Sequence, residues 1–240
     1  MLCIFGGTAA YHLNLAEYAQ VVGIETARTP YGQVTFTRLR MAGGAECLFL
    51  SRHGPGKLAR SARFVNHRAH VSGAALLGAT GILSWNGVGA INPALNVGDV
   101  VVPDDVLDET RSRETVIGNW GLGRNQTLVA RPFDEALRSA LIQKAHNYHL
   151  PITYVCTEGP RLETPAEIAA FGRLGADVVG MTLCPEVWLA AEIGLPYASL
   201  CAVTNMASGL GHLNPARNFG PEVGAKCLQA CLRAVEFLEN

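Results

Sequence analysis

The chain has 240 residues, which suits one α/β domain but does not by itself exclude two small ones. Hydrophobic residues make up 49% of the chain and charged residues only 16%, so the composition excludes a disordered protein. The 19 Lys and Arg face 20 Asp and Glu, and a formal net charge of -1 provides no basic surface for a nucleic-acid duplex.

Short apolar runs alternate with segments of helical pattern along the chain. Strands are predicted at 2–5, 45–50, 81–84, 99–102, 152–156, 177–179 and 197–203, and helices at 65–77, 133–149, 165–174, 185–193 and 222–238. Several of these strands are uniformly apolar, which is typical of a sheet covered on both faces. No linker or repeat interrupts the alternation, so we expect one α/β domain over residues 1–240.

Three features bear on the protein's surroundings. Residues 71–98 carry no charged side chain, but Gly, Asn and Pro interrupt them, so we expect a buried helix and strand rather than a membrane span. The N-terminus lacks the pattern of an export signal, and the seven dispersed cysteines show no CxxC pattern or metal-ligand spacing. Cys227 and Cys231 share a helical face and could meet a metal, but buried thiols are the favoured interpretation. We expect a cytoplasmic protein with no metal and no membrane partner.

The first two motifs that could carry chemistry each follow an apolar strand. Gly6-Gly7-Thr8 offers backbone N–H groups and a hydroxyl to an oxyanion. Arg52-His53 follows the strand at 45–50 and offers a fixed cation and an imidazole donor. Because open α/β sheets bind ligands at the carboxyl ends of their strands, these residues favour an anion such as phosphate. Taken singly, a tight turn, a surface arginine and a hydrogen-bonded histidine are the more ordinary explanations.

Four further segments repeat this arrangement after four later strands. They are Asn86-Gly87-Val88-Gly89, residues 157–164 with two carboxylates and an arginine, Met181-Thr182, and Thr204-Asn205. The surroundings of segment 157–164 otherwise tolerate little charge, so one of its carboxylates is expected to face a ligand. Together these strand ends indicate one shared polar site. Hydrolase and NTPase sites are not indicated, because the sequence has no G-x-S-x-G, no H-E-x-x-H and no complete P-loop.

In this order the motifs resemble the trimeric nucleoside phosphorylases, which include purine nucleoside, methylthioadenosine and methylthioinosine phosphorylases. The resemblance spans nearly the whole chain, and its specific parts are Gly6-Gly7-Thr8, Arg52-His53-Gly54, Asn86-Gly87-Val88-Gly89 with Val97-Gly98-Asp99, residues 158–164, residues 175–182 with Pro185-Glu186, and Thr204-Asn205. It implies a three-layer α/β fold with a mixed central sheet flanked by helices. It also implies a pentosyltransferase that performs reversible phosphorolysis of an N-glycosidic bond. The chain departs from the pattern at Ala9-Ala10, where relatives often have glycine.

The resemblance also assigns roles to single residues. Thr8, Arg52, His53, Gly87 and Thr182 would hold phosphate, Met181 the ribose, Glu163 with Asn205 the base, and Ala207 with Phe219 the rest of the substrate. Asn205 and His53 would be the catalytic side chains, with Asn205 bonded to N7 of the leaving purine. No cofactor is implied, because inorganic phosphate is a co-substrate that acts as nucleophile and as counter-ion to an oxocarbenium-like transition state.

Base preference follows from hydrogen-bond polarity. A 6-oxopurine presents O6 as acceptor and N1–H as donor, whereas a 6-aminopurine presents the reverse. The Glu163 carboxylate would accept from N1–H but would face a lone pair on adenine N1, a mismatch that costs ~1–3 kcal/mol. Methylthioadenosine-specific members of the family are understood to carry Asp in place of Asn205 and Ser in place of Glu163. The sequence therefore predicts a 6-oxopurine enzyme.

The group at the 5′ carbon of the nucleoside is read from segment 207–219, whose alignment with the family is open by one or two positions. Relatives that accept a 5′-hydroxyl are understood to carry His near the start of the last helix, where this chain has Asn218-Phe219-Gly220. That difference favours methylthioinosine. His212 could still serve a hydroxyl, so inosine or guanosine is the alternative, with methylthioadenosine a further one.

Three other functions stay open at this point. A nucleosidase of related fold would use water in place of phosphate, a nucleoside-binding module would perform no chemistry, and a dehydrogenase would need a fuller glycine fingerprint than this chain has. The family resemblance favours a homotrimeric enzyme of purine salvage. In such a trimer, a residue from 111–131 of the neighbouring subunit would close the sugar site.

Overall fold

The computed structural model describes residues 1–54, 59–112, 114–116, 131–145, 151–211 and 220–239. Its strands are β1 (Leu2–Gly6), β2 (Gln20–Thr29), β3 (Gly32–Arg40), β4 (Glu46–Ser51), β5 (Ile82–Ala90), β6 (Val100–Val101), β7 (Asp105–Asp108), β8 (Thr153–Cys156), β9 (Val178–Gly180) and β10 (Tyr197–Met206). Its α-helices are α1 (His67–Leu76), α2 (Glu135–Ala145), α3 (Pro165–Arg173), α4 (Leu183–Glu192) and α5 (Pro221–Glu239).

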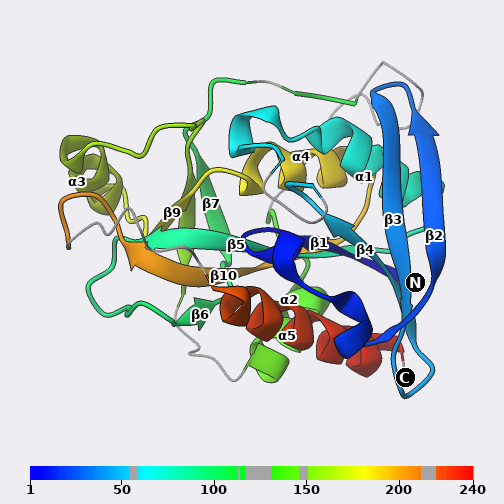
Figure 1. Ribbon diagram of the computed structural model, residues 1–240. Helices are drawn as coiled ribbons and strands as arrows, with labels where there is room; N and C mark the ends of the chain where they lie inside the picture. Colours follow the sequence, from blue (N-terminus) through cyan, green and yellow to red (C-terminus); the bar gives the residue numbers. More distant parts are fainter. Residues whose placement is uncertain (55–58, 113, 117–130, 146–150, 212–219, 240) are drawn as a thin grey trace.

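The strands form one mixed sheet through the centre of the molecule (Figure 1). Its order is β2-β3-β4-β1-β5-β9-β8-β7, and β10 pairs with β5 and β6. β1, β4, β5 and β10 run parallel to one another, and so do β7, β8 and β9. The two parallel groups meet where β5 pairs antiparallel with β9. This confirms the expected mixed sheet.

Helices cover both faces of this sheet. Figure 1 shows α1 and α4 on one face and α2 and α5 on the other. Successive residues of β1 alternate between two cores, because Cys3 and Phe5 pack on one side and Leu2 and Ile4 on the other. A strand buried on both faces needs apolar residues at every position, which explains the uniform apolar runs.

The five predicted helices are confirmed to within two residues at their described ends, and α2 is described only as far as residue 145. Two predicted strands were too short. The segment Asn86-Gly87-Val88-Gly89 was expected to follow a strand but lies within β5, and Thr204-Asn205 lies within β10. Both strands continue because they pair in parallel with each other up to Met206 and Ala90. Asparagine and glycine are typical of loops, but the glycines of β5 instead allow neighbouring segments to approach the strand closely.

The hairpin β2–β3 and the short strand β7 were not predicted. β2 is exposed along most of its length, including Val21, Val22 and Ile24, so it lacks the continuous apolar run of the central strands. β7 has only four residues, begins and ends with aspartate and lies at the edge of the sheet. Strands of this kind carry little hydrophobic signal.

Burial agrees with the expectations for the uncharged segment and the thiols. The segment 71–98 contributes most of α1 and all of β5, and both are largely buried. All seven cysteines are buried free thiols, including Cys227 and Cys231. Among the described helices, none combines the length and apolar character needed to cross a membrane. Nor does the described part of the chain gather three His, Cys, Asp or Glu side chains suited to a metal ion.

Candidate active site

A cavity lies where β5, β9 and β10 meet the segments that follow β1, β4 and β8. Eight of the predicted site residues line it: Thr8, His53, Gly87, Glu163, Met181, Thr182, Asn205 and Ala207. Arg52 does not line it, and Phe219 lies outside the described residues. The fold therefore brings together residues that are far apart in the sequence, as the strand-end argument predicts.

Thr8 and Gly87 lie side by side in the lining of the cavity. The Gly87 N–H donates to Thr8 Oγ1 at 3.2 Å, and a Cβ atom on Gly87 would lie 2.6 Å from that oxygen. Glycine is therefore required for the approach of β5 to the loop after β1. The Thr8 hydroxyl oxygen is an acceptor in this bond, so its hydrogen stays available to an anion in the cavity.

The loop turns at the residue after Thr8. Ala9 has φ 64°, in the left-handed region, and it is fully buried. This conformation costs a residue with a Cβ atom roughly 1–2 kcal/mol, so a glycine would fit the position with less strain. The turn points the Thr8 side chain toward Gly87.

His53 has a defined tautomer. Its Nδ1 lies 3.0 Å from the carbonyl oxygen of Arg60, and because a carbonyl only accepts, Nδ1 must carry a hydrogen. Burial and the charge of Arg52 lower the His53 pKa to about 4. At neutral pH the ring is therefore uncharged, and Nε2 presents a lone pair. The imidazole donor expected from the sequence requires protonation of Nε2.

Thr182 is bonded to the strand behind the cavity. Its hydroxyl donates to Asn86 Oδ1 at 2.6 Å, and Asn86 Nδ2 in turn donates to Ser199 Oγ at 2.7 Å. Asn86 Oδ1 also lies 3.3 Å from Arg52 Nη1. Asn86 thus joins Thr182 and Arg52, two of the residues assigned to phosphate.

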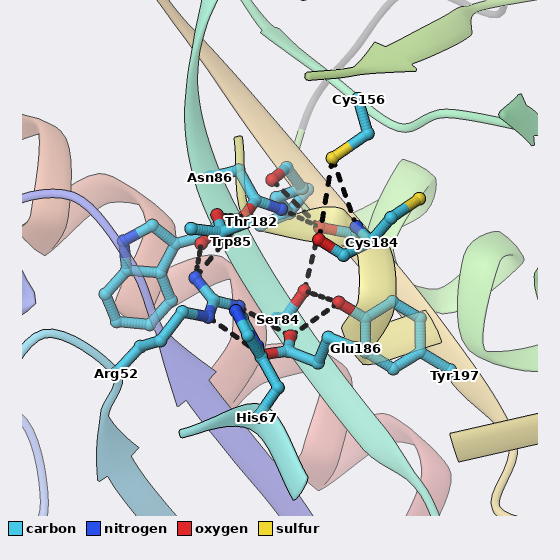
Figure 2. Close-up of polar contacts among 12 residues, drawn as sticks. Arg52, His67, Ser84, Trp85, Asn86, Cys156, Thr182, Cys184, Glu186 and Tyr197 are labelled. Carbon is cyan, nitrogen blue, oxygen red and sulfur yellow. Dashed lines mark hydrogen bonds and ion pairs between the residues drawn. The ribbon is translucent and has the colours of Figure 1, made fainter. Parts of the chain in front are cut away.

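Arg52 lies behind the cavity wall rather than in it. Figure 2 shows its guanidinium facing the Glu186 carboxylate, with Nε to Oε2 at 2.8 Å and Nη2 to Oε1 at 2.6 Å. Its Nη1 donates to the Trp85 carbonyl oxygen at 3.0 Å. Both Arg52 and Glu186 have no exposed surface. The guanidinium is therefore paired inside the protein, and a Cβ atom on Gly7 would lie 2.7 Å from its Nη1.

Glu186 collects three donors in this interior (Figure 2). Besides Arg52, the Tyr197 hydroxyl donates to it at 2.7 Å and His67 Nδ1 lies 3.3 Å away. Burial alone would raise the pKa of the Glu186 carboxyl, but Arg52 and His67 outweigh it and hold that pKa well below its usual range. The sequence motifs assign no role to Glu186. Its signal was a single charge within the apolar segment 183–191, since such a charge needs a buried partner.

Glu163 and Asn205 also line the cavity. Glu163 is 8% exposed, and its Oε1 accepts a 2.5 Å hydrogen bond from Thr157 Oγ1. Its Oε2 has no hydrogen-bond partner among the residues that the structure describes. An open oxygen on a largely buried carboxylate is an acceptor that a ligand in the cavity can meet.

Asn205 owes its direction to an irregularity in β10. The pairing of β10 with β5 shifts register between Val203 and Asn205, so Thr204 and Asn205 both line the cavity instead of pointing to opposite faces. Asn205 Nδ2 donates to the Met206 carbonyl oxygen at 2.8 Å, and Thr204 Oγ1 lies 2.9 Å from Asn205 Oδ1. One amide hydrogen and one oxygen lone pair remain for a ligand.

Met181 also lines the cavity. A Cβ atom on Gly159, which has φ 60°, would lie 2.7 Å from Met181 Sδ. The loop after β8 therefore passes close to the Met181 side chain. Ala207, which is buried, adds a small apolar part of the cavity wall.

The chain is similar to known proteins along nearly its whole length. A family profile described as "Phosphorylase superfamily" matches residues 2–236. The 6-oxopurine nucleoside phosphorylase of Pyrococcus furiosus is 39% identical over 219 residues, which cover 87% of this chain and 80% of that protein. A protein of Methanothermobacter thermautotrophicus named "Probable S-methyl-5'-thioinosine phosphorylase" is 38% identical over 210 residues, covering 88% of this chain and 73% of that one.

Solved structures agree with these relatives. A double mutant of the adenosine/methylthioadenosine phosphorylase of Schistosoma mansoni, in complex with adenine, matches with a TM-score of 0.87 and 31% identity. The match covers 99% of this chain and 91% of that one. The mixed sheet flanked by helices is thus the fold of nucleoside phosphorylase structures.

Proposed function

Since the chain belongs to the phosphorylase superfamily, we propose that it is a pentosyltransferase that cleaves 6-oxopurine nucleosides with inorganic phosphate. In the form that we favour, S-methyl-5′-thioinosine and phosphate give hypoxanthine and 5-methylthioribose 1-phosphate. The observation that carries the base assignment is the largely buried Glu163 carboxylate, which lines the cavity and whose Oε2 has no hydrogen-bond partner among the described residues. That oxygen suits the N1–H of a 6-oxopurine and opposes the N1 lone pair of a 6-aminopurine.

The reaction needs the residues assigned to phosphate and the residues assigned to the base together. A phosphate oxygen forms a bond to C1′ while the C1′–N9 bond breaks and its electron pair passes into the purine. Phosphate beside Thr8 would lie next to the cationic sugar carbon and stabilise it. The purine finally gains one proton and hydrogen phosphate loses one. Neutral His53, with a lone pair at Nε2, is suited to accept the hydrogen of bound hydrogen phosphate.

Asn205 serves the leaving purine. One hydrogen of its side-chain amide has no partner among the described residues, and in the cavity lined by Asn205 and Glu163 it can donate to N7 or to O6. Negative charge accumulates on the ring as the glycosidic bond breaks, so hydrogen bonds to these atoms strengthen in the transition state. In this assignment Asn205 and His53 act on the reacting groups, whereas Met181 holds the ribose.

Within the described residues, Ala207 bears on the group at the 5′ carbon. Ala207 is small and apolar, which supports a methylthio group, while Phe219 and His212 lie outside the described part of the chain. Relatives carry both names, since one is a 6-oxopurine nucleoside phosphorylase and another a probable S-methyl-5′-thioinosine phosphorylase. Inosine or guanosine is therefore the second candidate.

A substrate panel tests the proposal. Methylthioinosine, methylthioadenosine, inosine and guanosine are assayed with and without phosphate. We expect turnover only with phosphate, and a higher kcat/KM for methylthioinosine than for methylthioadenosine by on the order of 10-fold or more. The Asn205→Asp variant should narrow this ratio, because its carboxylate accepts from a 6-amino group. Turnover without phosphate would instead identify a nucleosidase.

The proposal extends to the setting of the enzyme. We infer a cytoplasmic homotrimer of purine salvage that uses no cofactor, with phosphate as co-substrate. Most of the segment 111–131, expected to close the sugar site of a neighbour, lies outside the described residues. Light scattering on the purified protein gives the molar mass that tests the trimer, since one chain has a mass of 25.5 kDa.

A further inference from the structure

Thr157 makes a contact that the proposed chemistry does not use. It is the first residue after β8, and its hydroxyl donates to Glu163 Oε1 at 2.5 Å. The acceptor is a carboxylate and the bond is short, as is usual for a hydroxyl donating to a charged oxygen. Thr157 itself is not among the residues that line the cavity with Glu163.

Both partners of this contact are held by regular structure. The Thr157 backbone N–H donates to the Gly180 carbonyl oxygen at 2.9 Å, which ties it to the end of β9. Glu163 directly precedes Thr164, the N-cap of α3, whose hydroxyl accepts from the Glu167 N–H at 3.2 Å. The hydrogen bond therefore joins the sheet to the start of a helix, across the loop between them.

The contact decides which carboxylate oxygen a ligand meets. Oε1 is occupied, and Oε2 has no partner among the described residues. A carboxylate can rotate about its last side-chain bond, which has a broad torsional preference. The Thr157 hydroxyl restricts that rotation, so the free oxygen keeps one direction in the cavity.

We propose that Thr157 is a positioning residue that sets base selectivity by fixing the Glu163 carboxylate for the N1–H of a 6-oxopurine. The inference rests on the proposed function, since it assumes that Glu163 reads the base. Without Thr157 the carboxylate would turn among several orientations, and the 6-oxopurine would lose part of an oriented acceptor. A 6-aminopurine gains little from that acceptor and would lose less.

Two variants at this position separate the hydroxyl from the volume of the side chain. Thr157→Val keeps the shape and removes the donor, and we expect it to lower the kcat/KM ratio of methylthioinosine to methylthioadenosine on the order of 10-fold. The loss should appear in kcat/KM for the nucleoside, while the KM for phosphate stays unchanged. Thr157→Ser keeps the donor and should retain most of the wild-type ratio.

A matched control comes from the other end of the same strand. Thr153 makes its hydrogen bonds through backbone atoms, to Asp177, so Thr153→Val tests a general effect of losing a hydroxyl from β8. It should leave the ratio at the wild-type value. Thermal unfolding of all variants shows whether each remains folded.

A double-mutant cycle tests whether Thr157 acts through Glu163. In the Glu163→Ala background, Thr157→Val should change the base ratio by less than 2-fold, because the acceptor of the Thr157 hydroxyl is gone. A full effect in that background, or an unchanged ratio in Thr157→Val alone, would overturn the inference. In either case phosphate-dependent turnover by the wild type would leave the proposed function standing, whereas its absence would remove the proposed function itself.

Discussion

Two sets of polar residues lie on either side of the same wall, and they differ in how their hydrogen bonds are satisfied. Behind the wall, Arg52, Glu186 and Tyr197 bond to one another and have almost no exposed surface (Figure 2). In the cavity, Thr8 and Glu163 each keep a donor or acceptor without a partner among the described residues. The polar groups behind the wall, the interior set, are hydrogen-bonded to one another, whereas the cavity residues, the cavity set, keep groups that can bond to a ligand.

A ligand site and a structural ion pair differ in whether their polar atoms already have protein partners. A charged residue is not by itself a sign of function, because Arg52 carries a full charge yet uses its donors inside the protein. An unpartnered atom on a buried side chain is the more specific sign. Asn86 connects the two sets, since it bonds to Thr182 on one side and lies near Arg52 on the other.

The largest effect should come from breaking the interior pair. Glu186→Leu leaves the Arg52 charge buried without its counter-ion, which should lower the free energy of unfolding by about 3–5 kcal/mol. Urea unfolding followed by circular dichroism measures this loss.

The control removes both charges. In the Arg52→Met, Glu186→Leu double variant no charge is left unpaired, so it should be more stable than Glu186→Leu alone. A single variant that loses less than about 1 kcal/mol would show that the interior set is not a paired ionic network.

The next largest effect is a loss of unfolding free energy at acid pH. Burial lowers the pKa of His53 to about 4 and of His70 to about 3, so the unfolded chain takes up protons at these residues before the folded chain does. Their contribution to stability is complete above pH 6.5 and falls as the pH drops toward the folded values. Between pH 7 and pH 5 each should cost about 2 kcal/mol of unfolding free energy. Chemical unfolding at a series of pH values measures the slope.

One substitution divides this slope between the two histidines. His70 Nδ1 is buried without a partner in the described residues, so His70→Phe removes a titrating group without breaking a recorded hydrogen bond. The variant should lose roughly half of the pH dependence. Equal slopes in the variant and the wild type would show that His70 is not held neutral by burial.

A smaller effect should come from the cavity set. Thr8→Val removes the hydroxyl hydrogen that is free to meet an anion, and we expect the KM for phosphate to rise on the order of 10-fold. Thr8→Ser keeps the hydroxyl and should stay close to the wild type. The measurement is initial rate against phosphate concentration at saturating nucleoside. An unchanged KM would place phosphate elsewhere in the cavity.

The sequence predicted the parts of the fold that have a strong hydrophobic signal. The buried strands β1, β4 and β8 read as apolar runs, and Pro165 after Thr164 correctly indicated the start of α3. The hairpin β2–β3 was missed because one side of β2 faces solvent, so its pattern is mixed. The continuations of β5 and β10 were missed because they depend on pairing between distant segments, which no local pattern contains.

For the site, the sequence predicted which residues lie close together. It did not predict which of them line the cavity and which lie behind its wall. Thr8, Glu163 and Asn205 follow from their places at strand ends, and they do line one cavity. That Arg52 faces Glu186, 134 positions away, depends on the packing of α4 against the sheet. Likewise, the orientation of Glu163 depends on Thr157, because only the folded loop shows which hydroxyl reaches the carboxylate.

The smallest expected effect is at Thr164, and it tests whether a residue next to Glu163 in the chain also affects base selectivity. Thr164 is adjacent to Glu163, but its hydroxyl caps α3 by accepting from the Glu167 N–H at 3.2 Å, while Glu167 Oε2 accepts from the Thr164 N–H at 2.7 Å. Thr164→Ala should therefore lower the unfolding free energy by about 1 kcal/mol, and Thr164→Ser should restore it. Neither should change the preference for a 6-oxopurine, in contrast to Thr157→Val. If Thr164→Ala alters base selectivity as strongly, then the start of α3, rather than the Thr157 hydroxyl, directs the Glu163 carboxylate.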